Sequence, residues 1–317
     1  MNRVGIIGLG FMGGVHLRNW QALNGVKVVA VCDANPNLGK VTQGNIDTGS
    51  DTLDLEGITV YVDIAEMLFN EQLDAVSITL PTHLHKTVTI QCLEAGVHVL
   101  CEKPMALNLA DCDAMIAVSK KKGKQLMIAH CIRFWPEYAW VKQAVGRREY
   151  GKVLTADFTR LTYAPAWDVG SWLTDSSKSG GLALDLHIHD LDFIQYLFGI
   201  PEGIHSRCCR SKHVKTWIDY GDERVISATA SWMMPESFGF QMAFNLIFEK
   251  AAVVFDGTTL SVYPSTGDSF VPEINEGDGY KGEIEYFSSL LEGKTKEIKI
   301  TPEQARESVR MTLETMK

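Results

Sequence analysis

The sequence lacks the features typical of membrane, nucleic-acid-binding and disulfide-stabilised proteins. No apolar run approaches the roughly 18 residues of a membrane helix, and the short run after Arg3 does not reach the length of a signal-peptide core. The net charge is −9 at pH 7, whereas nucleic acids and anionic membranes bind basic patches. The seven cysteines form no C-x-x-C pair, which favours a reducing compartment. We therefore expect a soluble, cytoplasmic protein without nucleic-acid or membrane partners.

What is present is an ordinary globular composition in two differently patterned halves. The 317 residues are 45% hydrophobic and 22% charged, enough for about two domains of roughly 150 residues. Residues 1–125 alternate short apolar runs with helical stretches, as a parallel βαβ sheet does. The pattern predicts a doubly wound, Rossmann-type parallel sheet. Its strands are expected at residues 3–7, 26–33, 58–62, 74–81, 97–102 and 125–131, and a short helix at 35–43.

Residues 126–317 follow another pattern, with long alternating strands that are not separated by helices. Such strands predict an α+β domain with an open, largely antiparallel sheet. We expect strands at 152–163, 224–234, 238–249 and 251–263, and helices at 134–145, 182–198, 280–293 and 301–317. The fold class is therefore α/β, with domains at 1–125 and 126–317.

A glycine-rich turn follows the first expected strand. Gly8, Gly10 and Gly13 have the G-x-G-x-x-G spacing, with Phe11 and Met12 inside the turn. In dinucleotide-binding proteins the first glycine permits a tight turn, the second lets the backbone approach the pyrophosphate, and the third allows helix and strand to pack. The helix that follows offers backbone N–H groups to phosphates. We therefore predict that these five residues bind a dinucleotide.

Asp33 ends the next strand, 20 residues after Gly13. A carboxylate at this place accepts hydrogen bonds from ribose hydroxyls and repels a 2′-phosphate. No arginine for such a phosphate follows at positions 34–35. The sequence thus favours NAD over NADP, and a helix-capping role for Asp33 is compatible with this.

Two charged stretches stand out against apolar surroundings. In "VLCEKPMA", residues 99–106, a buried strand ends in Glu102, Lys103 and Pro104. Ligands of open α/β sheets bind beyond the carboxyl ends of strands, and a cis Lys103–Pro104 bond is one way to form the turn there. In "GGLALDLHIHDLD", Asp185 and His189 are four residues apart and share one face of a helix.

Together, "GLGFMG", "TLPTHLH", "EAGVHVLCEKPMA" and "GGLALDLHIHDLD" resemble the glucose-fructose oxidoreductase and inositol dehydrogenase family, Gfo/Idh/MocA, over nearly the whole chain. The resemblance implies that Lys103, Asp185 and His189 are catalytic. His189 is suited to be the general base, because an imidazole titrates near neutral pH. Lys103 stabilises the developing alkoxide, and Glu102 orients the lysine or the nicotinamide ribose.

The same resemblance assigns further contacts and leaves some alternatives open. It implies cofactor contacts from Pro81, Thr82 and His85, which follow another expected strand. Arg133 either binds substrate or pairs with Glu137. Apart from the resemblance, Trp172 is a candidate for stacking against a sugar ring, because the C–H patches of sugars are apolar, although core packing is the commoner use of tryptophan. Tyr163 and Tyr280 are weaker candidates of the same kind.

No metal is expected. "DLHIHD" offers Asp185, His187, His189 and Asp190, but on a helix His187 and His189 point about 200° apart and do not share one ion. His187 is better explained as a capping or packing residue. Relatives usually carry a small residue at this position, so His187 affects the expected shape of the substrate pocket.

The sequence predicts an NAD-dependent dehydrogenase that acts on a secondary alcohol of a sugar, sugar derivative or cyclitol. Two alternatives stay open: an NAD-dependent glycosidase that works by transient oxidation, and a non-enzymatic sugar- or nucleotide-sensing regulator. Retention of both Lys103 and His189 argues against the regulator. We also expect a homodimer or homotetramer formed through the C-terminal sheet, because a large open sheet face favours association.

Overall fold

The computed structural model describes residues 1–35, 52–165, 172–295 and 298–316. The chain divides into two compact units. The first contains residues 1–131 and 280–306, and the second contains residues 132–279 and 307–317. A late segment of the chain therefore belongs to the first unit. The helix expected at 35–43 lies almost wholly outside the described residues.

The first unit is built on a six-stranded, fully parallel sheet in the order β3-β2-β1-β4-β5-β6. This is the doubly wound arrangement that the alternating pattern predicted. The strands lie where the apolar runs placed them, with ends that differ by at most three residues. They are β1 (Asn2–Ile7), β2 (Val26–Cys32), β3 (Thr59–Tyr61), β4 (Ala75–Ile78), β5 (His98–Glu102) and β6 (Leu126–Ala129).

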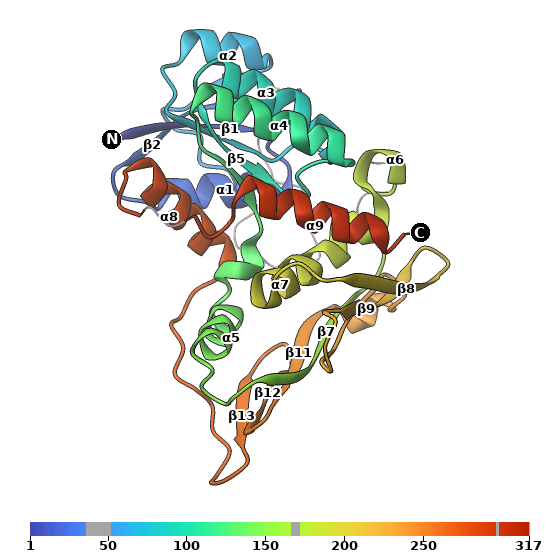
Figure 1. Ribbon diagram of the computed structural model, residues 1–317. Helices are drawn as coiled ribbons and strands as arrows, with labels where there is room; N and C mark the ends of the chain where they lie inside the picture. The colour runs from blue at the N-terminus through green and yellow to red at the C-terminus, as the bar shows by residue number, and fades with distance from the viewer. Residues whose placement is uncertain (36–51, 166–171, 296–297, 317) are drawn as a thin grey trace. The chain divides into compact units, whose positions relative to one another are not determined.

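Helices flank this sheet on both faces, with α2, α3 and α4 on one side and α1 and α8 on the other (Figure 1). Local signals set their ends. The Asp63 side chain accepts the Glu66 N–H at 2.8 Å at the start of α2, and Gly123 ends α4 at φ 62°. The helices are α1 (Phe11–Gln21), α2 (Ile64–Asn70), α3 (His85–Glu94), α4 (Leu109–Lys122) and α8 (Gly279–Leu291).

The second unit has a seven-stranded sheet in the order β13-β12-β11-β7-β10-β9-β8. The β7–β10 pair is parallel and the other pairs are antiparallel, so the expected open, largely antiparallel sheet is confirmed. Its strands are β7 (Val153–Thr162), β8 (Gly203–Cys209), β9 (His213–Asp219), β10 (Val225–Ser231), β11 (Phe240–Phe248), β12 (Ala251–Phe255) and β13 (Leu260–Pro264).

Two features of this sheet differ from the sequence pattern. The run at 251–263 is two strands, because Asp256 accepts the N–H groups of Thr258 and Thr259 at 2.8 Å and closes a hairpin turn. Strand β8 had no clear sequence signal, since most of its side chains are exposed. Strand β9, which was not among the expected strands, alternates buried and more exposed residues, as a half-buried strand does.

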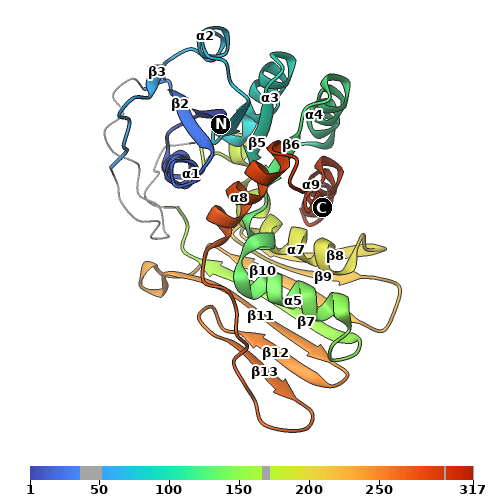
Figure 2. The same cartoon turned by 90° about the vertical axis from the view of Figure 1, so that its left-hand side faces the viewer.

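Helices α5 (Pro136–Arg147) and α7 (Ile188–Phe198) cover one face of the second sheet (Figure 2). The core between them is aromatic: the ring of Tyr138 lies 4.9 Å from the rings of both Phe193 and Phe244, edge to face. The second unit also contains the one-turn helix α6 (Ser176–Ser179) and most of α9 (Pro302–Glu314). No helix in the described residues has the length and apolar composition needed to cross a membrane.

Candidate active site

The glycine-rich turn joins β1 to α1, and two of its three glycines leave no room for a larger residue. Gly8 has φ +91°, and a Cβ there would lie 2.9 Å from the Thr79 carbonyl oxygen. A Cβ on Gly13 would lie 2.1 Å from the Gly8 carbonyl oxygen. Gly10 is different, because its Cβ would meet nothing within 4 Å. Gly8 and Gly13 are thus required by the turn itself, whereas Gly10 leaves its backbone accessible.

Helix α1 begins at Phe11 directly after this turn, and its N-cap residue, Gly10, has no side chain that could cap the first amides. Phe11 and Met12 are half-buried at its start. Free amides at a helix N-terminus, together with accessible backbone at Gly10, form a cradle suited to a pyrophosphate. The residues present therefore fit a dinucleotide.

Asp33, just beyond β2, is tied to the same turn. One carboxylate oxygen accepts the Leu9 N–H at 2.6 Å, and the other accepts the Asn35 N–H at 2.8 Å. The side chain is half-buried. Its negative charge is thus held beside the glycine-rich turn, where a ribose hydroxyl can reach an accessible carboxylate.

The segment after β4 contains the three predicted residues Pro81, Thr82 and His85. Pro81 is half-buried, whereas Thr82 and His85 are 3% and 1% exposed. The ring of His85 lies between two carbonyl oxygens, with Nδ1 at 2.8 Å from Pro104 and Nε2 at 2.8 Å from Leu80. Burial lowers the pKa of His85, although both carbonyl contacts act in the opposite direction. Both ring nitrogens thus face the main chain of the protein.

Lys103 is the one residue of the segment 99–106 that is not buried. It follows β5, and the Lys103–Pro104 peptide bond is cis. Its backbone N–H donates to Glu102 Oε2 at 3.0 Å. Burial favours the neutral form of Glu102, but the hydrogen bond from His16 and the charge of Lys103 keep its pKa below the ordinary value. An ionised, buried carboxylate therefore precedes an accessible amine.

His16, which the sequence analysis did not single out, holds that carboxylate. Its Nε2 lies 3.1 Å from Glu102 Oε1, and the histidine is fully buried. Glu283 of α8 is buried nearby, and one donor atom from each of His16, Glu102 and Glu283 lies within 4.8 Å of the others. Within the described ranges, this is the one trio of His, Cys, Asp or Glu residues close enough to hold a metal ion. A histidine in an otherwise apolar stretch of α1 was the available sequence signal.

In the second unit, Asp185 and His189 lie on a helix that begins with a π-helical turn at Ala183–His187 and continues as α7. Between residues 182 and 190, these two are the side chains that are not buried. Such π turns occur frequently at functional sites. The carboxylate and the imidazole are therefore presented together by a segment that is otherwise packed in the core.

Two buried ion pairs anchor this helix. Arg160 of β7 binds Asp190 through two contacts of 2.9 and 3.1 Å. Arg133 binds Asp192 at 2.7 and 2.8 Å, and Ser308 donates to the same carboxylate at 2.7 Å. Bidentate arginine–carboxylate pairs fix orientation as well as distance. Arg133, a candidate for substrate binding or for a pair with Glu137, is buried, and its guanidinium is bound to Asp192.

His187 points into the protein. It is fully buried, and its Nε2 lies 2.8 Å from Thr216 Oγ1 on β9. Burial, helped by the charges of Arg160 and His213, lowers the pKa of His187 to about 3. A neutral, hydrogen-bonded ring of this kind is a packing residue.

The aromatic candidates lie in separate places. Tyr163 is half-buried and forms an isolated bridge with Met233 in the second unit. Trp172 is half-buried in the turn before α6. Tyr280 is half-buried in the first turn of α8, which belongs to the first unit. Nothing in these positions tests a substrate contact, so all three stay predictions.

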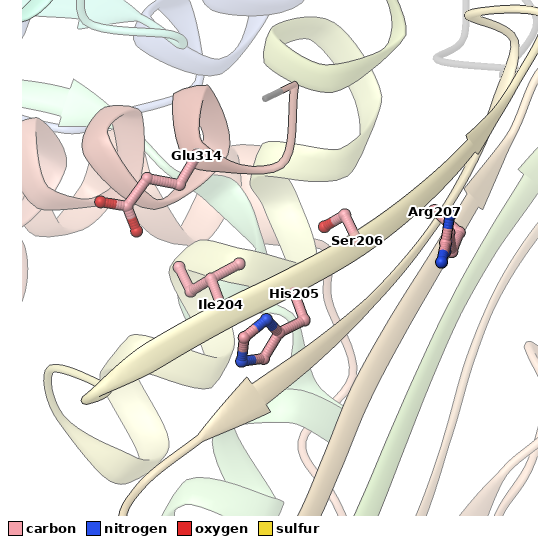
Figure 3. A pocket seen from close by; sticks show the side chains of 5 residues that line it. All are labelled: Ile204, His205, Ser206, Arg207 and Glu314. Atoms are coloured by element: carbon pink, nitrogen blue, oxygen red, sulfur yellow. The ribbon is translucent and has the colours of Figure 1, made fainter.

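A separate surface hollow in the second unit is lined by residues 204–207 of β8 and by Glu314 of α9 (Figure 3). Its lining contains none of the predicted site residues. Glu314 is already bound to Arg310 at 2.6 Å.

A parallel sheet with this strand order, a glycine-rich turn and an acidic residue after β2 place the first unit in the class of dinucleotide-binding Rossmann domains. Comparison with known proteins identifies the family. Residues 2–130 match the family model described as "Oxidoreductase family, NAD-binding Rossmann fold", and residues 138–254 match the GFO/IDH/MocA C-terminal domain. The chain belongs to the Gfo/Idh/MocA oxidoreductase family.

The relatives of this chain are named for different substrates. The chain is 32% identical over 200 residues to a 2,7-anhydro-N-acetylneuraminate hydratase of Mediterraneibacter gnavus, covering 63% of the chain and 50% of that protein. It is 32% identical over 197 residues to a myo-inositol 2-dehydrogenase of Thermotoga maritima, covering 62% of the chain and 55% of that protein. The chain thus matches about half the length of these curated relatives.

Solved structures agree on the fold. A levoglucosan dehydrogenase in complex with NADH and levoglucosan superposes with a TM-score of 0.83 at 21% identity, covering 99% of this chain and 96% of that one. At this identity the likeness establishes the fold alone.

Proposed function

We propose that this protein is an NAD-dependent oxidoreductase that transfers a hydride between nicotinamide and a secondary alcohol of a sugar, sugar derivative or cyclitol. The observation that carries the proposal is shared by both units. Each presents accessible ionisable side chains from a segment that is otherwise buried: Lys103 after β5, and Asp185 with His189 at the π turn. Each of these ionisable groups is half-buried, which costs solvation free energy, and such a cost is typical of residues that serve a site.

The proposed chemistry assigns one task to each group. His189 takes the hydroxyl proton of the substrate, and Lys103 stabilises the oxygen as negative charge develops there. An ammonium 4 Å from that oxygen contributes about 4 kcal/mol at an effective dielectric of 20. Asp185 accepts a hydrogen bond from the same hydroxyl, from the Lys103 ammonium or from the His189 imidazole. Bound NAD would supply the carbon that accepts the hydride.

The cofactor contacts of the proposal follow from the first unit. The bare backbone at Gly10 and the first amides of α1 would hold the pyrophosphate, and Asp33 the adenosine ribose. The charge of Asp33 beside the turn favours NAD over NADP. Pro81 and Thr82, after β4, would contact the nicotinamide half.

The test is a panel of sugars, sugar acids and cyclitols offered to the full chain with NAD and, separately, with NADP. NADH formation with at least one member, abolished in Lys103→Ala but with NAD binding intact, is the expected result. Saturable NAD binding without turnover on the whole panel would instead favour the sensing alternative.

A redox-neutral reaction is the second candidate, because one of the relatives is named as a hydratase of an anhydro sugar. Transient oxidation of a sugar carbon assists elimination or hydration at a neighbouring position, and the same cofactor is then restored. The two candidates differ in their products. A converted sugar without accumulated NADH would identify the redox-neutral enzyme.

Association through the second sheet is part of the proposal. Trp217, Ile247 and Tyr263 are 42%, 47% and 49% exposed and alternate with buried neighbours on β9, β11 and β13. Light scattering should report a dimer or tetramer, and Ile247→Glu should shift it toward a smaller species. A wild-type monomer would contradict this assignment.

A further inference from the structure

We propose that His16 is a positioning residue for Lys103: through Glu102, it ties the helix that follows the glycine-rich turn to the backbone that carries the amine. The role of Lys103 itself rests on the proposed function. The link between His16 and the Lys103 backbone does not, because it is a property of the first unit alone.

The link is a continuous chain of buried hydrogen bonds. Trp20 Nε1 donates to Ser77 Oγ at 2.8 Å, and the same hydroxyl lies 3.0 Å from His16 Nδ1. His16 Nε2 lies 3.1 Å from Glu102 Oε1, and Glu102 Oε2 accepts the Lys103 N–H. Three elements, α1, β4 and β5, are thereby joined at one point.

The chemistry of the partners fixes where the protons lie. A carboxylate only accepts hydrogen bonds, so His16 Nε2 carries the hydrogen that points at Glu102. Ser77 accepts from Trp20 and has its own O–H to offer to Nδ1. One proton on Nε2 therefore satisfies the whole chain, and a buried network satisfied in this way is rigid.

The backbone after Lys103 is fixed as well, through a contact to Pro104. The His85 ring contacts the Pro104 carbonyl oxygen at 2.8 Å and the Leu80 carbonyl oxygen at 2.8 Å. Glu102 and Pro104 are both buried, whereas Lys103 between them is partly exposed. The side chain of Lys103 thus leaves a backbone that is fixed before and after it.

His16 lies less than one helical turn after Gly13 on the same helix. The backbone proposed to hold the pyrophosphate and the backbone that carries the amine are therefore connected through a single imidazole. Loss of that imidazole should misplace the amine and leave the phosphate cradle in place. Misplacement of about 1 Å can cost about 100-fold in rate.

The chain offers a matched pair of variants. A glutamine amide can occupy the position of Nε2 and keep the donor to Glu102, whereas an asparagine amide reaches only as far as Nδ1. We expect His16→Asn and His16→Ala to lower kcat by about 10- to 100-fold, with the Kd for NAD within about twofold of wild type. His16→Gln should recover most of the lost rate. The exposed His83 provides the control, His83→Gln.

A second measurement does not depend on activity. In the protein without cofactor, hydrogen exchange of the Lys103 amide should become faster by about tenfold in His16→Ala and His16→Asn, and stay near the wild-type rate in His16→Gln. Ser77→Ala removes a hydrogen-bond partner of His16 but keeps the bond from His16 to Glu102, so it should give a smaller increase in the exchange rate. If His16→Ala fails to fold, the Asn and Gln variants and Ser77→Ala still give the comparison.

Three results would overturn the inference. Unchanged Lys103 amide exchange in His16→Asn would show that the link does not hold that backbone. A weakened Kd for NAD with unchanged kcat would assign His16 to the cofactor cradle. A stoichiometric metal in the purified protein, lost in His16→Ala, would make His16, Glu102 and Glu283 a metal site. Absence of turnover in the wild type counts against the proposed function alone, because the exchange measurement still decides the role of His16.

Discussion

The carboxylate of Asp33 accepts the backbone N–H of Leu9 at 2.6 Å, which joins the end of β2 to the glycine-rich turn. One side chain thus has a structural task in the turn and, in the proposed function, a binding task toward the adenosine ribose. An experiment can distinguish the structural task from the binding task, because only binding of the ribose discriminates between NAD and NADP.

Asp33→Ser should weaken NAD binding by about 10-fold, since one or two hydrogen bonds to a charged acceptor are lost. It should also narrow the preference for NAD over NADP, because the charge that repels a 2′-phosphate is gone. Calorimetric titration with both cofactors measures this. Equal losses for NAD and NADP would mean that Asp33 serves the turn alone.

Lys103→Met should leave NAD binding within about twofold and lower kcat by about 1000-fold, the equivalent of about 4 kcal/mol. Methionine keeps the length of the side chain and removes the charge. Lys121→Met, in the exposed last turn of α4, is the control and should behave as wild type. A Lys103→Met enzyme with normal turnover would contradict the assigned role.

His189→Gln should remove the rise of kcat/KM with pH near neutrality. The general base works in its neutral form, so activity should increase with pH near neutrality, as the imidazole loses its proton, and level off above it. His205→Gln, at an exposed position of β8, should keep the wild-type profile. If the profile of His189→Gln still shows the same step, another group is the base.

His187→Gln should make the fold less sensitive to acid. The folded-state pKa of His187, about 3, lies below the unfolded value of about 6.5. The contribution of the neutral ring is therefore fully present above about pH 6.5 and is lost as the pH falls toward 3, with a slope of about 1.4 kcal/mol per pH unit. Glutamine keeps the bond to Thr216 without titrating. Urea unfolding at several pH values measures the dependence of the free energy of unfolding on pH. The same dependence between pH 3 and 6.5 in wild type and variant would refute this prediction.

Asp192→Ala should lower the free energy of unfolding by about 3–5 kcal/mol, because it leaves the buried Arg133 guanidinium without its carboxylate. Glu285→Ala, which removes an exposed pair with Lys281, should change it by about 1 kcal/mol or less. Denaturant unfolding compares the two. Similar small effects from both would show that the buried pair does not hold α7 in place.

Structural features that depend on residues close together in the chain could be predicted from the sequence. The G-x-G-x-x-G spacing predicted a turn whose positive φ and close contacts require glycine at Gly8 and Gly13. The cap of α2 is equally local, because the Asp63 carboxylate accepts the N–H of Glu66, three residues later. The period of the apolar residues marked most of the strands, since it reports which side of each element is buried.

Features set by distant residues did not follow from it. Glu137 lies four residues from Arg133, yet the structure pairs Arg133 with Asp192, 59 residues away. His16 meets Glu102 across 86 residues. These partners depend on which elements pack together, and an isolated histidine or arginine in the sequence carries no mark of a distant partner.

The sequence by itself determined the two types of sheet, the glycine-rich turn and the family, because these depend on local patterns: the period of the apolar residues and the spacing within short motifs. Only the tertiary structure decided that residues 280–306 belong with the first unit and that His187, expected to cap or to pack, is a packing residue bound to Thr216. It also decided which buried carboxylate each of His16, Arg133 and Arg160 contacts. The physical reason is that a buried charge must find a partner in space, and packing between elements decides where that partner lies.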